Sequence, residues 1–152
     1  MNKKPVKALI FDYGEVICPQ DRDKIKEMSS RLMLGEKDFS EIYFRYRLEY
    51  DLNNLSPGEY WKKVLHDCNL SKSAMEIEEL IKIDIKSWLS FDENMLSFIK
   101  EIKDKVFKIA ILSNMPSPIL EKMEDCFTWL SMFETVIFSC RVRSVKPEPE
   151  IY

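Results

Sequence analysis

Three short apolar runs, far apart along the chain and each followed by polar residues, constrain the fold most. They occupy residues 6–11, 107–112 and 135–140. A short, nearly continuous apolar run is typical of a strand buried on both faces of a parallel sheet. Residues 117–132, between the second and third runs, have the apolar periodicity of a helix. We therefore predict a doubly wound, parallel, Rossmann-like α/β sheet, in which ligands bind at the carboxyl ends of the strands.

The long stretch between the first and second runs predicts a helical insertion. Residues 19–90 carry helical patterns throughout, including two capping-box sequences that begin at Ser56 and Ser73. Gly35 stands where it could end the first of these helices. We expect four aromatic side chains at helical spacing to pack the insertion against the sheet domain. These four are Phe39, Tyr43, Tyr46 and Tyr50.

Composition excludes several classes of protein. The 152 residues carry 23 Lys and Arg against 26 Asp and Glu, so the net charge is -3. We expect no nucleic-acid partner, because the phosphate backbone demands a basic face. No apolar run approaches the roughly 18 residues that a membrane span needs, so we expect no membrane association. The four cysteines are dispersed, which predicts reduced thiols in a cytoplasmic protein.

Three motifs at or just after the predicted strand ends carry a resemblance to a known family. Residues 10–17 (IFDYGEVI) resemble the first motif of the haloacid dehalogenase-like (HAD) hydrolases. Residues 111–114 (ILSN) resemble the second motif, and residues 145–152 (VKPEPEIY) resemble the third. The helical insertion is similar to the cap of that family. The resemblance implies a HAD-type α/β core over residues 1–18 and 91–152, with a helical cap over residues 19–90.

The resemblance also implies roles for individual residues. Asp12 would be the nucleophile that forms a covalent aspartyl-phosphate, and Lys146 would supply a positive charge beside it. Ser113 and Asn114 would bind phosphoryl oxygens. Magnesium would screen the repulsion between Asp12 and an anionic substrate, and its implied ligands are the Asp12 carboxylate and the Gly14 carbonyl.

The chain departs from the family pattern in three places. The phosphatases of the family usually have a second aspartate, which protonates the leaving group, where this chain has Gly14; the chain is closer to the D-x-G-x-V variety. Arg143 also stands where the third motif often has glycine. The fourth, acidic motif has no counterpart before Tyr152, so we interpret the chain as C-terminally truncated. The first strand would then be a bare sheet edge through which the chain self-associates.

These residues favour one function and leave two alternatives open. The favoured function is a magnesium-dependent HAD-like phosphatase of a small phosphomonoester, weakened or inactive because the fourth motif is absent. The first alternative is a non-catalytic truncated remnant or interaction module. The second is a 2-haloacid dehalogenase, which is disfavoured because those members carry tyrosine at the position of Gly14. Arg45 and Arg47, on one cap helix, could face the active-site cleft and bind an anionic substrate, but we expect them to be exposed to solvent. We interpret His66, also on a cap helix, as structural or exposed rather than as a catalytic base.

Overall fold

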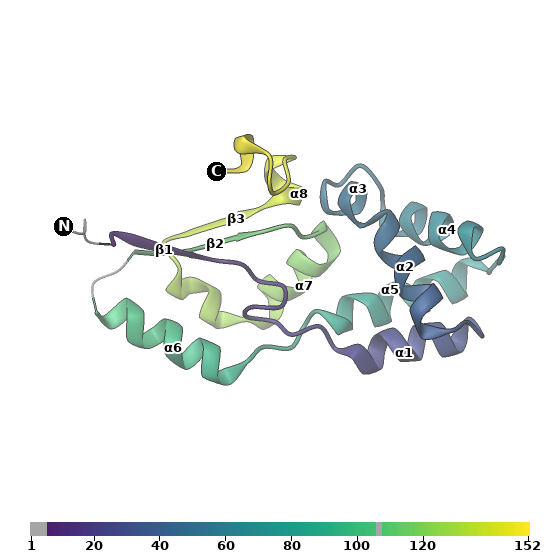
Figure 1. Cartoon of the computed structure of the whole chain (residues 1–152), viewed down its shortest axis with the longest axis horizontal. Coiled ribbons are helices and arrows are strands. Elements are labelled where there is room, and N and C mark those ends of the chain that lie inside the picture. Colours follow the sequence, from purple (N-terminus) through teal and green to yellow (C-terminus); the bar gives the residue numbers. More distant parts are fainter. Residues whose placement is uncertain (1–5, 106–107) are drawn as a thin grey trace.

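The computed structural model describes residues 6–105 and 108–152 (Figure 1). Phe107, the first residue of the second predicted strand, and residues 1–5 lie outside the described residues. The elements in chain order are β1 (Ala8–Phe11), α1 (Arg22–Arg31), α2 (Glu36–Arg45), α3 (Arg47–Asp51), α4 (Pro57–Asp67), α5 (Ala74–Ser87), α6 (Glu93–Asp104), β2 (Lys108–Ser113), α7 (Ser117–Cys126), η1 (Thr128–Met132), β3 (Thr135–Phe138), α8 (Ser139–Val142) and η2 (Pro149–Ile151). No helix among the described residues is long and apolar enough to cross a membrane.

The predicted parallel α/β sheet is confirmed. Its three strands are parallel in the order β1-β2-β3, so the carboxyl ends of β1 and β2 lie side by side. Phe11 at the end of β1 pairs with Ile111 of β2, and the chain of β2 continues two residues further. The third strand ends at Phe138 rather than at Cys140, because Ser139 already begins the short helix α8.

The helices α6 and α7 cover one face of this sheet (Figure 1). Ile99 of α6 and Met123 of α7 pack with Ile109 and Ile111 of β2 in a single buried core. The first apolar run is not buried on both faces as predicted, because Ile10 on the opposite face is 62% exposed. The helix predicted over 117–132 is also interrupted: α7 ends at Cys126, and a 3₁₀ helix follows.

The cap, formed by α1–α5, has a hydrophobic core of its own. The aromatic stripe fills this core and does not pack the cap against the sheet, as we had expected: Phe39 and Tyr43 contact Trp61, and Tyr50 stacks on Tyr60. Both capping boxes form at the predicted serines. Gly35 does not end the first helix. It is the N-cap of α2, and Met33 takes the left-handed conformation after α1 instead.

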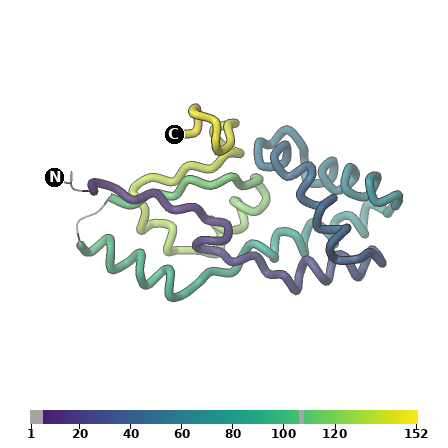
Figure 2. The backbone as a smooth tube through the Cα atoms, in the orientation of Figure 1, coloured from purple at the N-terminus to yellow at the C-terminus, as the bar shows by residue number. Residues whose placement is uncertain are grey.

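Core and cap are joined by two chain segments that run next to each other (Figure 2). The Asp21 N–H donates to the Ser87 carbonyl at 3.0 Å, and the Asp92 N–H donates to the Ile17 carbonyl at 2.8 Å. The Tyr13 hydroxyl also donates to the Trp88 carbonyl at 2.6 Å. The chain therefore enters and leaves the cap at one place, close to the end of β1.

A second set of contacts joins residues 51–54 of the cap to α7 and α8 of the core. We call these contacts the cap–core latch. They are Ser139 Oγ to the Asp51 carbonyl at 2.7 Å, Asn53 Nδ2 to Ser117 Oγ at 2.5 Å, and Arg143 Nη2 to Asn54 Oδ1 at 2.9 Å. Asn53 and Arg143 both have positive φ, a conformation that asparagine tolerates better than most residues.

Candidate active site

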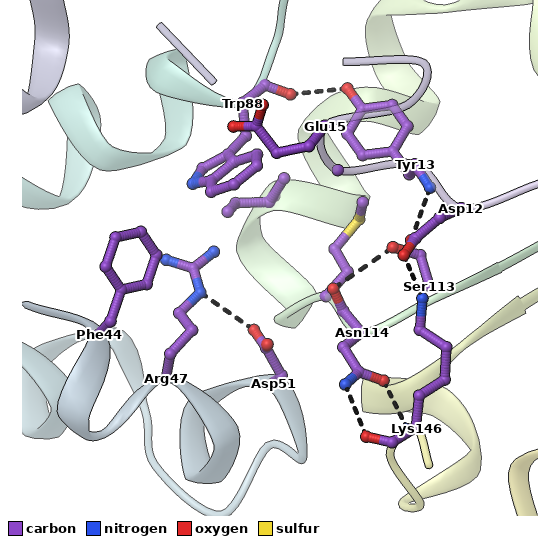
Figure 3. A pocket seen from close by; sticks show the side chains of 13 residues that line it. Asp12, Tyr13, Glu15, Phe44, Arg47, Asp51, Trp88, Ser113, Asn114 and Lys146 are labelled. Atoms are coloured by element: carbon purple, nitrogen blue, oxygen red, sulfur yellow. Dashed lines mark hydrogen bonds and ion pairs between the residues drawn. The ribbon is translucent and has the colours of Figure 1, made fainter. Parts of the chain in front are cut away.

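Asp12 stands at the carboxyl end of β1 with both carboxylate oxygens engaged. The Tyr13 N–H donates to Oδ1 at 2.8 Å, and the Lys146 Nζ forms an ion pair with Oδ2 (Figure 3). Lys146 arrives from a distant loop after α8, in which Arg143 adopts a left-handed conformation with φ 56°. The side chain of Asp12 remains 40% exposed, so an incoming substrate can reach it. The structure thus brings together the two predicted catalytic residues.

Ser113 ends β2 and Asn114 follows it, and both line the same pocket as Asp12. Ser113 is buried. The Asn114 side chain pairs with the main chain of Lys146: its Oδ1 accepts from the Lys146 N–H at 2.8 Å, and its Nδ2 donates to the Lys146 carbonyl at 3.3 Å. Asn114 therefore positions the lysine, a role that sequence reasoning missed. Its contact with a phosphoryl oxygen stays a prediction, for which the second Nδ2 hydrogen is available.

These residues open onto a pocket of about 280 Å³ between the core and the cap. Figure 3 shows the core wall, with Asp12, Ser113 and Lys146, facing a wall from the cap. The side chains on the cap wall are Phe44, Arg47, Asp51 and Trp88. A ligand held at Asp12 would therefore direct its remaining part at these cap residues.

Gly14 has a steric reason to lack a side chain. A Cβ atom built on Gly14 would lie 3.3 Å from Cζ3 of the Trp88 ring, which is tighter than an ordinary van der Waals contact. A side chain at this position would therefore crowd the indole unless Trp88 shifted by a few tenths of an ångström. The Gly14 carbonyl accepts no hydrogen bond from the described residues, so its oxygen is free to bind a ligand.

The donors at this end of the sheet fit magnesium in kind. The Asp12 carboxylate and the Gly14 carbonyl are hard oxygen ligands, and Mg²⁺ commonly takes one or two carboxylates and completes its shell with water and substrate phosphate. Across residues 6–105 and 108–152, no group of three or more His, Cys, Asp or Glu side chains is arranged to hold a metal. The described part of the chain thus supplies a partial ligand set.

Arg47 was predicted to be exposed, and this prediction is wrong. Its side chain is only 13% exposed because three acceptors hold it inside the cap. Nε donates to Asp51 Oδ1 at 3.1 Å, and Nη1 donates to the Tyr43 hydroxyl at 3.0 Å and to Asp84 Oδ1 at 3.2 Å. Asp84 is fully buried. The neighbouring Arg45, by contrast, lies at the surface as predicted.

Asp51 is the functional candidate that sequence reasoning missed. Burial raises the pKa of its carboxyl from the ordinary value to about 6, although the Arg47 guanidinium opposes the shift. No local pattern marks Asp51, because it is one acidic residue among many on the cap helices. Its position in the pocket depends on the packing of α3 against α8, which only the folded chain reveals.

The fold and this arrangement define a class: a Rossmann-like α/β protein with a helical cap, and with an aspartate, a lysine and a serine gathered under that cap at the strand ends. No protein-family model matches the chain, and no similar sequence was found among curated proteins. Solved structures do match. The chain is similar to a HAD family enzyme from Bacteroides thetaiotaomicron solved as a magnesium complex, with 19% identity and a TM-score of 0.72 over 97% of this chain and 75% of that chain.

Two further solved structures extend the comparison. A predicted HAD-like family hydrolase from Porphyromonas gingivalis is 16% identical with a TM-score of 0.68, over 96% of this chain and 72% of that chain. The L-2-haloacid dehalogenase from Xanthobacter autotrophicus, with chloropropionic acid covalently bound, is 18% identical with a TM-score of 0.65, over 97% and 62%. The chain therefore has the fold of the HAD-like hydrolases, as its three motifs predicted.

Proposed function

We propose that the chain is a HAD-like hydrolase that cleaves small phosphomonoesters with magnesium, through an aspartyl-phosphate at Asp12. The observation that carries this proposal is the pairing of Asp12 with the Tyr13 N–H and the Lys146 ammonium at the mouth of the pocket. A carboxylate held in this way could act as a nucleophile, and an ammonium beside it would stabilise charge on a phosphoryl group, so the pairing supports the proposal.

In the proposed reaction the chain's own side chains bind and orient the phosphoryl group. An oxygen of Asp12 attacks phosphorus while the ester oxygen leaves in line. Lys146 neutralises charge on the transferring group, and Asn114 holds Lys146 in place through its main chain. The Ser113 hydroxyl donates to a phosphoryl oxygen. Water then hydrolyses the aspartyl-phosphate and regenerates Asp12.

Magnesium would be held by the Asp12 carboxylate and the Gly14 carbonyl, and when bound it would neutralise the charge between two anions. The Bacteroides enzyme was also solved with magnesium and inorganic phosphate, which supports phosphate as the ligand proposed for this site. Removal of divalent cations with a chelator should abolish phosphate release, and added Mg²⁺ should restore it.

The decisive experiment compares wild type with Asp12→Asn. With Mg²⁺ present, we expect wild type to release phosphate from p-nitrophenyl phosphate, and we expect Asn at position 12 to lower the rate by about 10³-fold or more, because the amide is not a nucleophile. Circular dichroism would check that the variant is folded. Equal background rates in the two proteins would overturn the proposal and favour a non-catalytic module.

The haloacid dehalogenase in the comparison keeps carbon chemistry as a second candidate. In that reaction Asp12 would displace halide from carbon and would need no metal. The assay is chloride release from 2-chloropropionate in the presence of a chelator. We expect no chloride release, because the carbonyl oxygen of Gly14 would favour a hydrated cation beside Asp12. If chloride is released by wild type and not by Asp12→Asn, the proposed function becomes that of a dehalogenase and not that of a phosphatase.

A further inference from the structure

The proposed phosphatase needs a proton donor that its motif residues do not supply. An alkyl ester leaves slowly as an alkoxide, and protonation of that oxygen by a positioned acid contributes typically 10²–10⁴-fold. Gly14 has no side chain, and the ring of Trp88 lies 3.3 Å from the position that a Cβ atom would take. Lys146 is already paired with Asp12, where the phosphoryl group would bind, and not with the leaving group. The donor therefore has to come from another wall of the pocket.

Two further carboxyl groups line the pocket, those of Glu15 and Asp51. Glu15 is exposed to solvent, and its Oε1 accepts a hydrogen bond from the Gln20 N–H at 3.4 Å. Asp51 is buried on the cap wall, and Figure 3 shows its carboxyl group directed into the space between Arg47 and Asn114. A leaving group that extends from Asp12 toward the cap would meet Asp51.

The position of Asp51 is fixed from two sides. On the cap side, Arg47 Nε donates to one carboxylate oxygen at 3.1 Å, which leaves the other oxygen for a ligand. On the core side, the Ser139 hydroxyl donates to the Asp51 carbonyl at 2.7 Å and accepts from the Met115 N–H at 2.9 Å. Ser139 thus ties the loop that follows Ser113 directly to the helix that carries Asp51.

From this geometry we propose that Asp51 is the general acid of the reaction. The cap would thus supply the carboxyl group that the phosphatases of the family usually carry at the position of Gly14. This inference rests on the proposed phosphatase function. When Asp12 attacks phosphorus, the bond from phosphorus to the ester oxygen breaks and its electron pair stays on that oxygen. The Asp51 carboxyl proton moves to the oxygen, so the leaving group departs as an alcohol. Asp51 regains its proton from solvent before the next turnover, and the proton of the water that hydrolyses the aspartyl-phosphate leaves with the phosphate product.

The electrostatic surroundings of Asp51 support this role. Burial raises its pKa to about 6, the buried Asp84 on α5 adds to the rise, and Arg47 on its own helix opposes it. The carboxyl group is therefore close to half-protonated near pH 6, where it can both give and accept a proton. The rate with an alkyl ester should fall as pH rises through this value, because the acid form is lost.

The experiment uses leaving groups of different basicity. Wild type, Asp51→Asn and Glu15→Gln would be assayed with p-nitrophenyl phosphate, whose phenolate leaves unaided, and with glycerol phosphate, whose alkoxide does not. We expect Asp51→Asn to lower kcat on glycerol phosphate by about 10²–10⁴-fold and on the aryl ester by less than about 10-fold. Glu15→Gln should match wild type on both. Asp51→Glu should recover part of the alkyl activity, because it restores a carboxyl group.

The outcomes separate the acid from the nucleophile. An equal loss on both esters in Asp51→Asn, no loss on either, or a selective loss in Glu15→Gln would overturn the assignment of the acid and leave the phosphatase intact. In wild type we expect the rate with the alkyl ester to fall as pH rises. If this fall is lost in Asp51→Asn, the result supports Asp51 as the acid. If aryl phosphate cleavage does not depend on Asp12, the proposed function fails, and the role of Asp51 fails with it.

Discussion

At the scale of single residues, Arg47 has the most consequential environment in the cap. It is paired with Asp51 and with the fully buried Asp84, and its guanidinium lies 5.4 Å from the centre of the Tyr50 ring and 5.5 Å from that of Trp88. Removal of one partner from a buried charge network leaves the others uncompensated. The cap therefore depends on this one cation.

We predict that Arg47→Ala lowers the free energy of unfolding by about 3–5 kcal/mol, because Asp84 would be left buried without its counter-charge. Arg45→Ala is the matched control. Arg45 is also paired with an aspartate, Asp67, but its side chain is 54% exposed, so its loss should cost less than about 1 kcal/mol. Urea denaturation of the two variants measures the difference. Similar values for both would show that burial of Arg47 contributes nothing.

The same two arginines show how far sequence reasoning reaches. Asp12, Ser113 and Lys146 could be predicted because each belongs to a short local motif next to an apolar run. Arg45 and Arg47 have the same charge and neighbouring positions, and nothing local separates them. Helix α2 ends at Arg45 and α3 begins at Arg47, with Tyr46 between them outside helical geometry. That break turns Arg47 inward, and it arises from tertiary packing of the cap.

At the scale of elements, the segment from Asp51 to Asn54 matters most, because it connects the cap to the core. The cap–core latch holds this segment against α7 and α8. Periodicity predicted the helices on both sides of the segment. The contacts themselves join residues 64 to 89 positions apart, so no local pattern could reveal them. Asn53 is the simplest point at which to test the latch.

We predict that Asn53→Gly speeds amide hydrogen exchange in α3 by roughly 5- to 30-fold, because the loss of its side-chain hydrogen bonds removes about 1–2 kcal/mol that holds the segment closed. Glycine keeps the positive φ of this position, so the backbone is not strained. Asn69→Gly is the control. Asn69 also has positive φ but lies after α4, within the cap. Mass spectrometry of the α3 peptide should show faster exchange only in Asn53→Gly.

At the scale of the whole molecule, the sheet has an exposed edge. Among residues 6–105 and 108–152, β1 lies at one end of the order β1-β2-β3, and Val6 and Ile10 are each more than half exposed. An unpaired apolar strand is a template for pairing with another strand. The position of the first strand at a sheet edge was expected from the family resemblance. The exposure of its side chains depends on which helices cover which face, and both α6 and α7 cover the face opposite Ile10.

We predict that the chain self-associates through β1. Ile10→Lys should shift it to the monomer, because a charged side chain on an edge strand opposes pairing with another strand. Light scattering coupled to size-exclusion chromatography measures the molar mass. Met33→Lys, which replaces an exposed methionine on the cap, should leave the association unchanged. A wild-type protein that is monomeric at all concentrations would contradict this prediction.

The two chain segments that join the cap to the core lie next to each other, so the cap could be exchanged as a unit. Because Asp21 and Ser87 are hydrogen-bonded neighbours, the whole of α1–α5 could be transplanted as one continuous segment without reordering a strand. Such an exchange would alter the cap wall, for which we propose contact with the leaving group, and preserve the core wall, for which we propose phosphate binding. The transplant has one requirement: Ser117, Ser139 and Arg143 belong to the recipient core, so a new cap has to match these three anchor points.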